Sequence, residues 1–157
     1  MDDVMIARAL HVLGVIHWIG GVAFVTLIVL PLAASRATAQ EALALFESVE
    51  RRFSAQVRIS IPLVGATGLW MAYRLDLWAR FVDPHFWWMG AMLGLWLVFV
   101  LIVFVLEPVL HARFEQTARR DPASALHKMI VMHTILLALA TVTAFGAVAG
   151  AHGLAFF

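Results

Sequence analysis

The chain has 157 residues, enough for one domain, and 63% of them are hydrophobic while only 13% carry a charge. Soluble domains are about half apolar and about a quarter charged, so this chain has too few polar residues to cover a surface that faces water. The formal net charge of +1 provides no concentrated basic face and excludes nucleic acid as a partner. The sequence has no cysteine, which excludes disulfides, thiolate metal sites and covalent haem attachment and leaves seven histidines for metal or redox chemistry.

The first predicted element is a transmembrane helix over residues 5–34. Residues 9–35 contain no Asp, Glu, Lys or Arg, and this run is longer than the roughly 20 residues that a spanning helix needs. A cleaved signal peptide is the alternative for an apolar N-terminus. Its apolar region is only about 7–15 residues long and follows a basic start, whereas this chain begins with Asp2 and Asp3. We therefore interpret the run as a permanent span.

The second predicted element is one long helix over residues 39–74. Thr38 and Glu41 have the spacing of a capping box, which predicts the start of the helix. The following residues are amphipathic, and only residues 59–73 form an uncharged stretch. We expect the first third of this helix to extend into water and its last part to span the membrane.

The third and fourth predicted elements are helices over residues 84–113 and 122–155. Each begins at an Asp-Pro pair, Asp83-Pro84 and Asp121-Pro122, which is typical of an N-cap followed by proline at the first helical position. Both contain more than 20 consecutive residues without Asp, Glu, Lys or Arg. Four helices with short connections predict an all-α, up-down-up-down bundle that forms a single transmembrane domain over residues 1–157.

The distribution of Lys and Arg predicts the orientation of this bundle. One side would carry eight basic residues: Arg36, Arg51, Arg52, Arg58, Arg113, Arg119, Arg120 and Lys128. The other side would carry three: Arg8, Arg74 and Arg80. Because cytoplasmic loops are enriched in Lys and Arg, we expect both termini on the non-cytoplasmic side. In a bacterium this means a multi-pass protein of the inner membrane with periplasmic termini.

Two histidines, His17 and His133, are predicted to lie deep in their spans, where an ionisable residue indicates a functional site. His17 has Gly14 three residues before it and Gly20 and Gly21 three and four residues after it. A helix face cleared in this way would leave room for a flat macrocycle, and haem b is held between helices by axial imidazoles. Counting residues along the helices predicts an offset of about 10 Å between the two histidines. The alternative is a neutral histidine hydrogen-bonded across helices.

The other candidate histidines lie nearer the outer surface. His11 is about two turns inside it, while His85 and His152 are at helix ends. These three residues define an alternative, a copper site on the outer face, because imidazole is a good copper ligand. The candidate cofactor ligands are therefore His17, His11, His133, His152 and His85.

The first helix also resembles a known family. The segment from Ala9 to Gly14, then Trp18-Ile19-Gly20-Gly21 and the closing Leu30-Pro31, is similar to the first helix of the copper-resistance D (CopD) family and of HemJ-type protoporphyrinogen oxidases. The resemblance implies a small bacterial four-helix membrane protein that holds haem b or handles copper, with His11 as the position that carries over. His17 has no counterpart in the HemJ-type pattern.

Three functions follow from these observations. The first is a membrane b-type haem protein, a cytochrome that carries electrons or an oxidoreductase that oxidises a small substrate. The second is a copper-binding or copper-transport protein, and the third is a HemJ-like protoporphyrinogen IX oxidase. Besides the lipid bilayer, the partners left open are a quinone, a periplasmic redox protein and a second copy of the chain.

Overall fold

The computed structural model describes the backbone of residues 1–154, and the side chains of these residues except 110–115 and 119. Residues 1–154 contain helices and turns and no β-strand, which confirms the predicted all-α fold. Three helical stretches, Asp2–Ala34, Pro84–Val109 and Pro122–Ala151, are long and apolar enough to cross a membrane. The helices are α1 (Asp2–Phe24), η1 (Val25–Val29), α2 (Leu30–Ala34), α3 (Ala39–Arg74), η2 (Trp78–Phe81), η3 (Pro84–Phe86), α4 (Trp87–Val100), η4 (Leu101–Leu106), α5 (Glu107–Arg120) and α6 (Pro122–Ala151).

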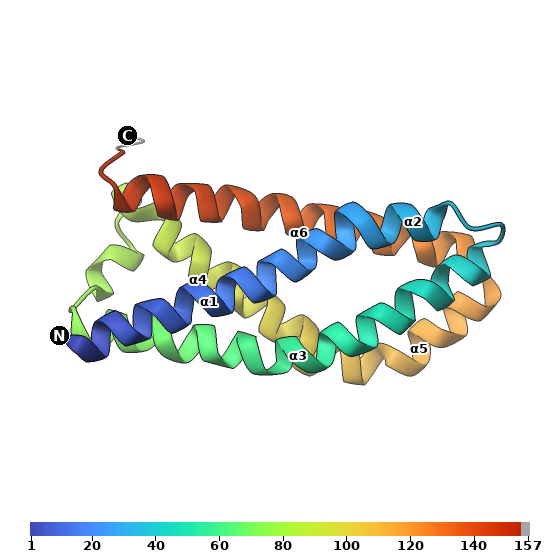
Figure 1. Ribbon diagram of the computed structural model, residues 1–157, viewed down its shortest axis with the longest axis horizontal. Coiled ribbons are helices and arrows are strands. Elements are labelled where there is room, and N and C mark those ends of the chain that lie inside the picture. Colours follow the sequence, from blue (N-terminus) through green and yellow to red (C-terminus); the bar gives the residue numbers. More distant parts are fainter. Residues whose placement is uncertain (155–157) are drawn as a thin grey trace.

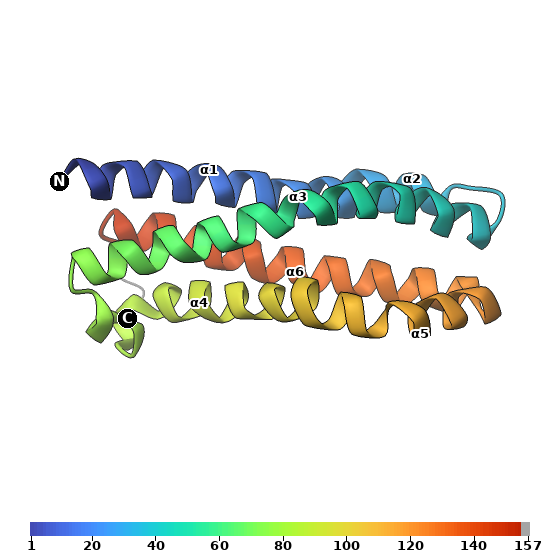
Figure 2. The ribbon, with the colours of Figure 1, turned by 90° about the horizontal axis from the view of Figure 1, so that it is seen from below.

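Successive long helices run alongside one another in alternating directions (Figures 1 and 2). The chain runs along α1, η1 and α2, returns along α3, runs out again along α4, η4 and α5, and returns along α6. As a result α1 begins and α6 ends at the same end of the molecule (Figure 1). The last helix ends at Ala151, and residue 155, where the sequence predicted its end, lies outside the described residues.

The predicted helix starts are made by local hydrogen bonds. The hydroxyl of Thr38 accepts the backbone N–H of Glu41 at 3.2 Å, and the Glu41 carboxylate accepts the backbone N–H of Thr38 at 3.2 Å, so the capping box is confirmed. The Asp121 carboxylate likewise accepts the backbone N–H of Ser124 at 3.0 Å. Asp83 instead caps the 3₁₀ turn η3, and α4 begins only at Trp87.

Two π-helical segments precede prolines that lie inside continuous helical rods. Segment η1 ends two residues before Pro31, and η4 ends two residues before Pro108. Proline lacks an N–H group, and its ring clashes with the carbonyl four residues earlier, which disturbs a regular α-helix. Pro62 of α3 has no π segment beside it, so a π segment accompanies only Pro31 and Pro108. The wider π turns accommodate each proline without ending the helix.

The apolar face of the first third of α3 is covered by other helices, while the extension of this segment beyond the membrane stays a prediction. Leu43 and Phe46 are buried, and Phe46 packs in one cluster with Val25 and Leu30. Leu126 and Met129 of α6 pack against the same cluster. The reason is that α2 and the beginning of α6 run beside this part of α3, so its apolar face is covered by protein while its charged face stays exposed.

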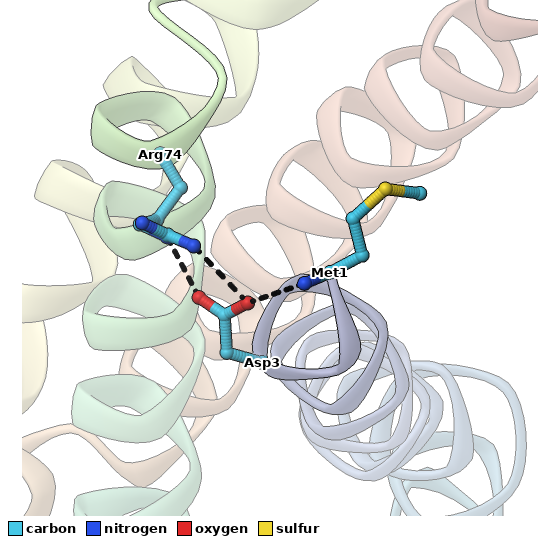
Figure 3. Close-up of polar contacts among 3 residues, drawn as sticks. All are labelled: Met1, Asp3 and Arg74. Atoms are coloured by element: carbon cyan, nitrogen blue, oxygen red, sulfur yellow. Dashed lines mark hydrogen bonds and ion pairs between the residues drawn. The ribbon is translucent and has the colours of Figure 1, made fainter.

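At the opposite end of α3, an ion pair joins its last residue to the start of α1 (Figure 3). Arg74 donates to the Asp3 carboxylate from Nε at 2.7 Å and from Nη2 at 3.3 Å. The N-terminal ammonium of Met1 lies 3.4 Å from the same carboxylate. These contacts fix the alignment of α1 and α3, and with it the residues of α3 that face each histidine of α1.

Candidate functional site

His11 lies between α1 and α3, and α3 fixes the orientation of its ring. Its Nδ1 is 3.0 Å from the backbone oxygen of Val64 and 3.2 Å from Oγ1 of Thr67. A carbonyl oxygen can only accept, so Nδ1 carries the proton and donates it. The ring lies close to Gly68, where an added Cβ would be 3.1 Å from its Cε1. The arrangement leaves the lone pair of Nε2 without a bond to any described side chain.

This hydrogen-bonding pattern is the one that histidine ligands of metals use. A metal-bound imidazole commonly donates its other N–H to a backbone carbonyl or carboxylate, which fixes its tautomer and orientation. His11 meets this requirement with Val64, a residue of a different helix. The bond to Val64 fixes the tautomer of His11 and leaves Nε2 as the unprotonated ring nitrogen.

His17 is placed differently, on an exposed face of α1. Its Nε2 donates to the side-chain oxygen of Gln56 at 3.1 Å, and its ring centroid is 6.2 Å from that of Phe53. The predicted cleared face around it is largely wrong, because α3 fills it. A Cβ on Gly14 would lie 2.7 Å from Val64, and one on Gly21 would overlap the Phe53 ring.

His133 lies at a different position along the bundle axis from His11 and His17. Its Nδ1 donates to the backbone oxygen of Met129 at 2.9 Å, and its ring meets Phe46 edge-on with centroids 5.4 Å apart. Phe46 precedes Val64 by 18 residues on α3, about 27 Å at 1.5 Å per residue. His11 and His133 are thus too far apart to bind one haem iron from opposite sides.

The level of His17 lies between these two. Its neighbour Phe53 is seven residues from Phe46 on α3, or about 10 Å, which is the offset predicted between His17 and His133. Among the described side chains, no hydrogen bond or ring contact joins two histidines. The three histidines of the spans are therefore three separate positions and not one ligand set.

The two remaining candidates are exposed at helix ends. The Nδ1 of His152 donates to the backbone oxygen of Val148 at 2.7 Å, within its own helix. His85 contributes its backbone N–H to the Asp83 cap. In the part of the chain that the structure describes, no group of three His, Asp or Glu side chains could hold a metal ion. The outer-face set of His11, His85 and His152 is accordingly not assembled there.

A polar cluster between α3 and the start of α5 was not predicted as a site. Ser54 is buried, and its hydroxyl lies 2.9 Å and 2.7 Å from the two carboxylate oxygens of Glu107. Arg58 donates to the same carboxylate at 3.1 Å. Glu50, one turn before Ser54, lies outside the three apolar spans. Burial, and then the charges of Glu107 and Glu47, raise its pKa to about 7.

The sequence contained a signal for this cluster. Glu107 is the first charged residue after the apolar run 86–106, and Ser54 and Arg58 are four residues apart on α3, so they share one face of that helix. The pairing itself depends on how far α4 and η4 run alongside α3, which no local pattern specifies.

Comparison of the chain with family models, with curated proteins and with solved structures finds no match. The resemblance of the first helix to the CopD and HemJ-type families therefore stays a prediction from the sequence.

Proposed function

We propose that the chain is a multi-pass protein of a bacterial inner membrane, in which α3 forms a fourth span and both termini are periplasmic. Support comes from the contacts between α1 and α3, which join Asp3 to Arg74, His11 to Val64, and His17 to Gln56. If α1 crosses the bilayer, the antiparallel helix α3, which forms polar contacts with it at three positions along its length, crosses the same membrane region. The excess of Lys and Arg at the other end supports the orientation.

We further propose that this bundle would hold haem b, with Nε2 of His11 binding the iron. The observation that carries the proposal is the bond from His11 Nδ1–H to the Val64 carbonyl, which leaves Nε2 free inside the membrane-spanning part of the bundle. The position of His11 in the CopD-like first helix supports the same assignment. His17 fits less well, because its Nε2 is already bonded to Gln56.

In this function each residue of the chain has a limited role. His11 binds, while the Val64 carbonyl and the Thr67 hydroxyl hold its ring and its tautomer. Thr67 is buried and donates to the backbone oxygen of Leu63 at 2.6 Å, so its own position is fixed. The haem would supply one-electron redox chemistry, either to carry electrons or to oxidise a small substrate.

The test is an absorption spectrum of the detergent-purified protein, oxidised and reduced, after expression with sufficient haem supply. We expect a Soret band that changes on reduction, and its loss in His11→Ala and His11→Asn. An Asn side chain can still donate to Val64, so it keeps the helix contact without providing an imidazole. The matched control is His127→Ala, since His127 is exposed on α6 and should leave the spectrum unchanged.

Two results would overturn the haem assignment. One is a folded wild-type protein with no Soret band even after incubation with haemin. The other is a band that survives in His11→Asn with unaltered position and intensity. Added imidazole should restore the band in His11→Ala if the missing ligand is the only defect.

A further inference from the structure

The pair formed by His17 and Gln56 is a polar site on an exposed face of the bundle. Both residues are exposed, and His17 lies 14 residues after Asp3, about 21 Å along α1. The hydrocarbon core of a bilayer is about 30 Å thick. In the proposed membrane placement, this pair lies near the cytoplasmic boundary of the hydrocarbon core, close to the level of Arg58.

The hydrogen bond within the pair determines what it offers to a ligand. Because Nε2 of His17 donates to Oε1 of Gln56, the lone pair of Nδ1 is left as an acceptor. The Gln56 amide nitrogen keeps two N–H donors, and no bond from it to a described residue is present. A ligand that pairs with both groups must therefore both donate and accept a hydrogen bond.

The helix surface next to the pair is open at one position and aromatic beside it. Gly20, one turn beyond His17, has no atom within 4 Å of the position where a Cβ would stand, so the helix surface is open there. The Phe53 ring, which packs on Gly21 and is tilted by 42° to the His17 ring, adds an aromatic surface beside it. Leu13 and Phe24 of α1 are also exposed and add apolar surface for a chain or ring.

We propose that His17 and Gln56 bind the head of a lipid-soluble quinol. One quinol hydroxyl donates to Nδ1 of His17, and its oxygen accepts an N–H of Gln56, while the ring lies over Gly20 beside Phe53. A phospholipid acyl chain matches neither polar group. The inference uses the membrane placement of the proposed function and does not depend on haem.

The test uses the full chain in lipid nanodiscs and a photoreactive azido-quinone with a short alkyl tail, reduced to the quinol before illumination. We expect saturable labelling, mapped by mass spectrometry to peptides containing His17 or Gln56 and prevented by excess decylubiquinol. His17→Ala and Gln56→Leu should each weaken labelling about tenfold, the effect of one lost hydrogen bond of about 1.4 kcal/mol. The matched controls are His127→Ala and Gln40→Leu, which change exposed residues of the same types and should leave it unaltered.

Three outcomes would overturn the inference: labelling that does not saturate, labelling spread evenly over lipid-facing helices, or labelling unchanged in His17→Ala. A wild-type dimer that becomes a monomer in both His17→Ala and Gln56→Leu would also overturn it, because a second copy would then cover the pair. Failure of the haem proposal has a separate signature. His11→Asn should abolish the Soret band without changing quinol labelling, and His17→Ala should do the reverse.

Discussion

The two halves of the bundle are held together by different means. All ten glycines fall within four segments, residues 14–21, 65–68, 90–94 and 146–153. Because the chain runs back and forth, these segments come together in one half of the molecule (Figure 1). We call this the glycine half. The other half, built from residues 22–64 and 95–145, has no glycine and contains both π segments and the Glu107 cluster.

In the glycine half, large rings pack directly against the backbone of a neighbouring helix. At the boundary between the halves, Trp96 packs on Gly65 and donates its indole N–H to the backbone oxygen of Ile61 at 2.9 Å. Trp87 and Trp88 pack in the same way on Gly146 and Gly150 of α6. Small residues at such positions allow helices in a membrane to approach closely, where no hydrophobic effect drives their association.

In the glycine-free half, the contacts are made by larger side chains and by charge. Phe46 fills the space between α3, η1 and α2, and Glu107 is held by Ser54 and Arg58. The comparison suggests a division of roles. The glycine half provides the close contacts around His11, while the glycine-free half contains Glu50, whose pKa is raised.

The largest effect is expected from Gly65→Ala in the glycine half. Its Cβ would overlap the Trp96 indole, so the ring must move and its bond to the Ile61 carbonyl must break. Overpacking costs about 1–3 kcal/mol and an unmatched buried donor costs a similar amount, so we expect a loss of about 4 kcal/mol in unfolding free energy. Thermal or SDS unfolding of the detergent-purified protein measures it.

The matched control is Gly94→Ala, because no atom lies within 4 Å of its added Cβ. This variant should stay within about 1 kcal/mol of wild type, the size of the helix propensity term alone. Equal stability of the two variants would contradict the assignment of Gly65 to a close helix contact.

A smaller effect, confined to the glycine-free half, is expected from pH. The pKa of Glu50 is raised from 4.5 to about 7, so the folded protein holds a proton that the unfolded chain has already released. The contribution of Glu50 to stability should therefore be fully present below about pH 4.5 and be lost as pH rises to about 7. At about 1.4 kcal/mol per pKa unit, the loss is at most about 3 kcal/mol.

Glu50→Gln isolates this contribution, because its amide resembles the protonated carboxyl. The difference in unfolding free energy between the variant and wild type should be small at pH 4.5 and should favour the variant above pH 7. The comparison leaves the neighbouring charged groups unchanged. These are Glu107 and Glu47, whose charges raise the Glu50 pKa, and Arg58, which is bonded to Glu107. A pH profile parallel to that of wild type would count against the assignment.

Helix starts could be predicted from the sequence because they depend on neighbouring residues. Thr38 pairs with Glu41, and Asp121 accepts from Ser124, so each cap has its hydrogen-bonding partner within four positions. The π segments could not be predicted in the same way. Pro31 and Pro108 signal that the helix must change, but packing decides whether it kinks, ends or widens.

For the candidate site, the sequence could predict where each residue lies along its own helix but not which residues of other helices it contacts. Residue counting predicted the offset of about 10 Å between His17 and His133, and their contacts with Phe53 and Phe46 agree with it. Counting could not predict that the Phe53 side chain occupies the space beside Gly21. Whether a glycine leaves a cavity or admits a side chain depends on the neighbouring helix and not on its own sequence.

The smallest effect is expected from Ser54→Ala, which tests whether the Glu107 cluster holds the glycine-free half together. The Ser54 hydroxyl lies within hydrogen-bonding distance of both carboxylate oxygens of Glu107, and hydrogen bonds to charged groups contribute about 1.5–3 kcal/mol. Arg58 remains bonded to the carboxylate, so we expect a loss of about 1–2 kcal/mol. Ser48→Ala is the control, since Ser48 is exposed and its hydroxyl donates only to the Leu45 carbonyl. Equal unfolding free energies for the two variants would mean that the apolar contacts around Phe46, and not the Glu107 cluster, hold this half together.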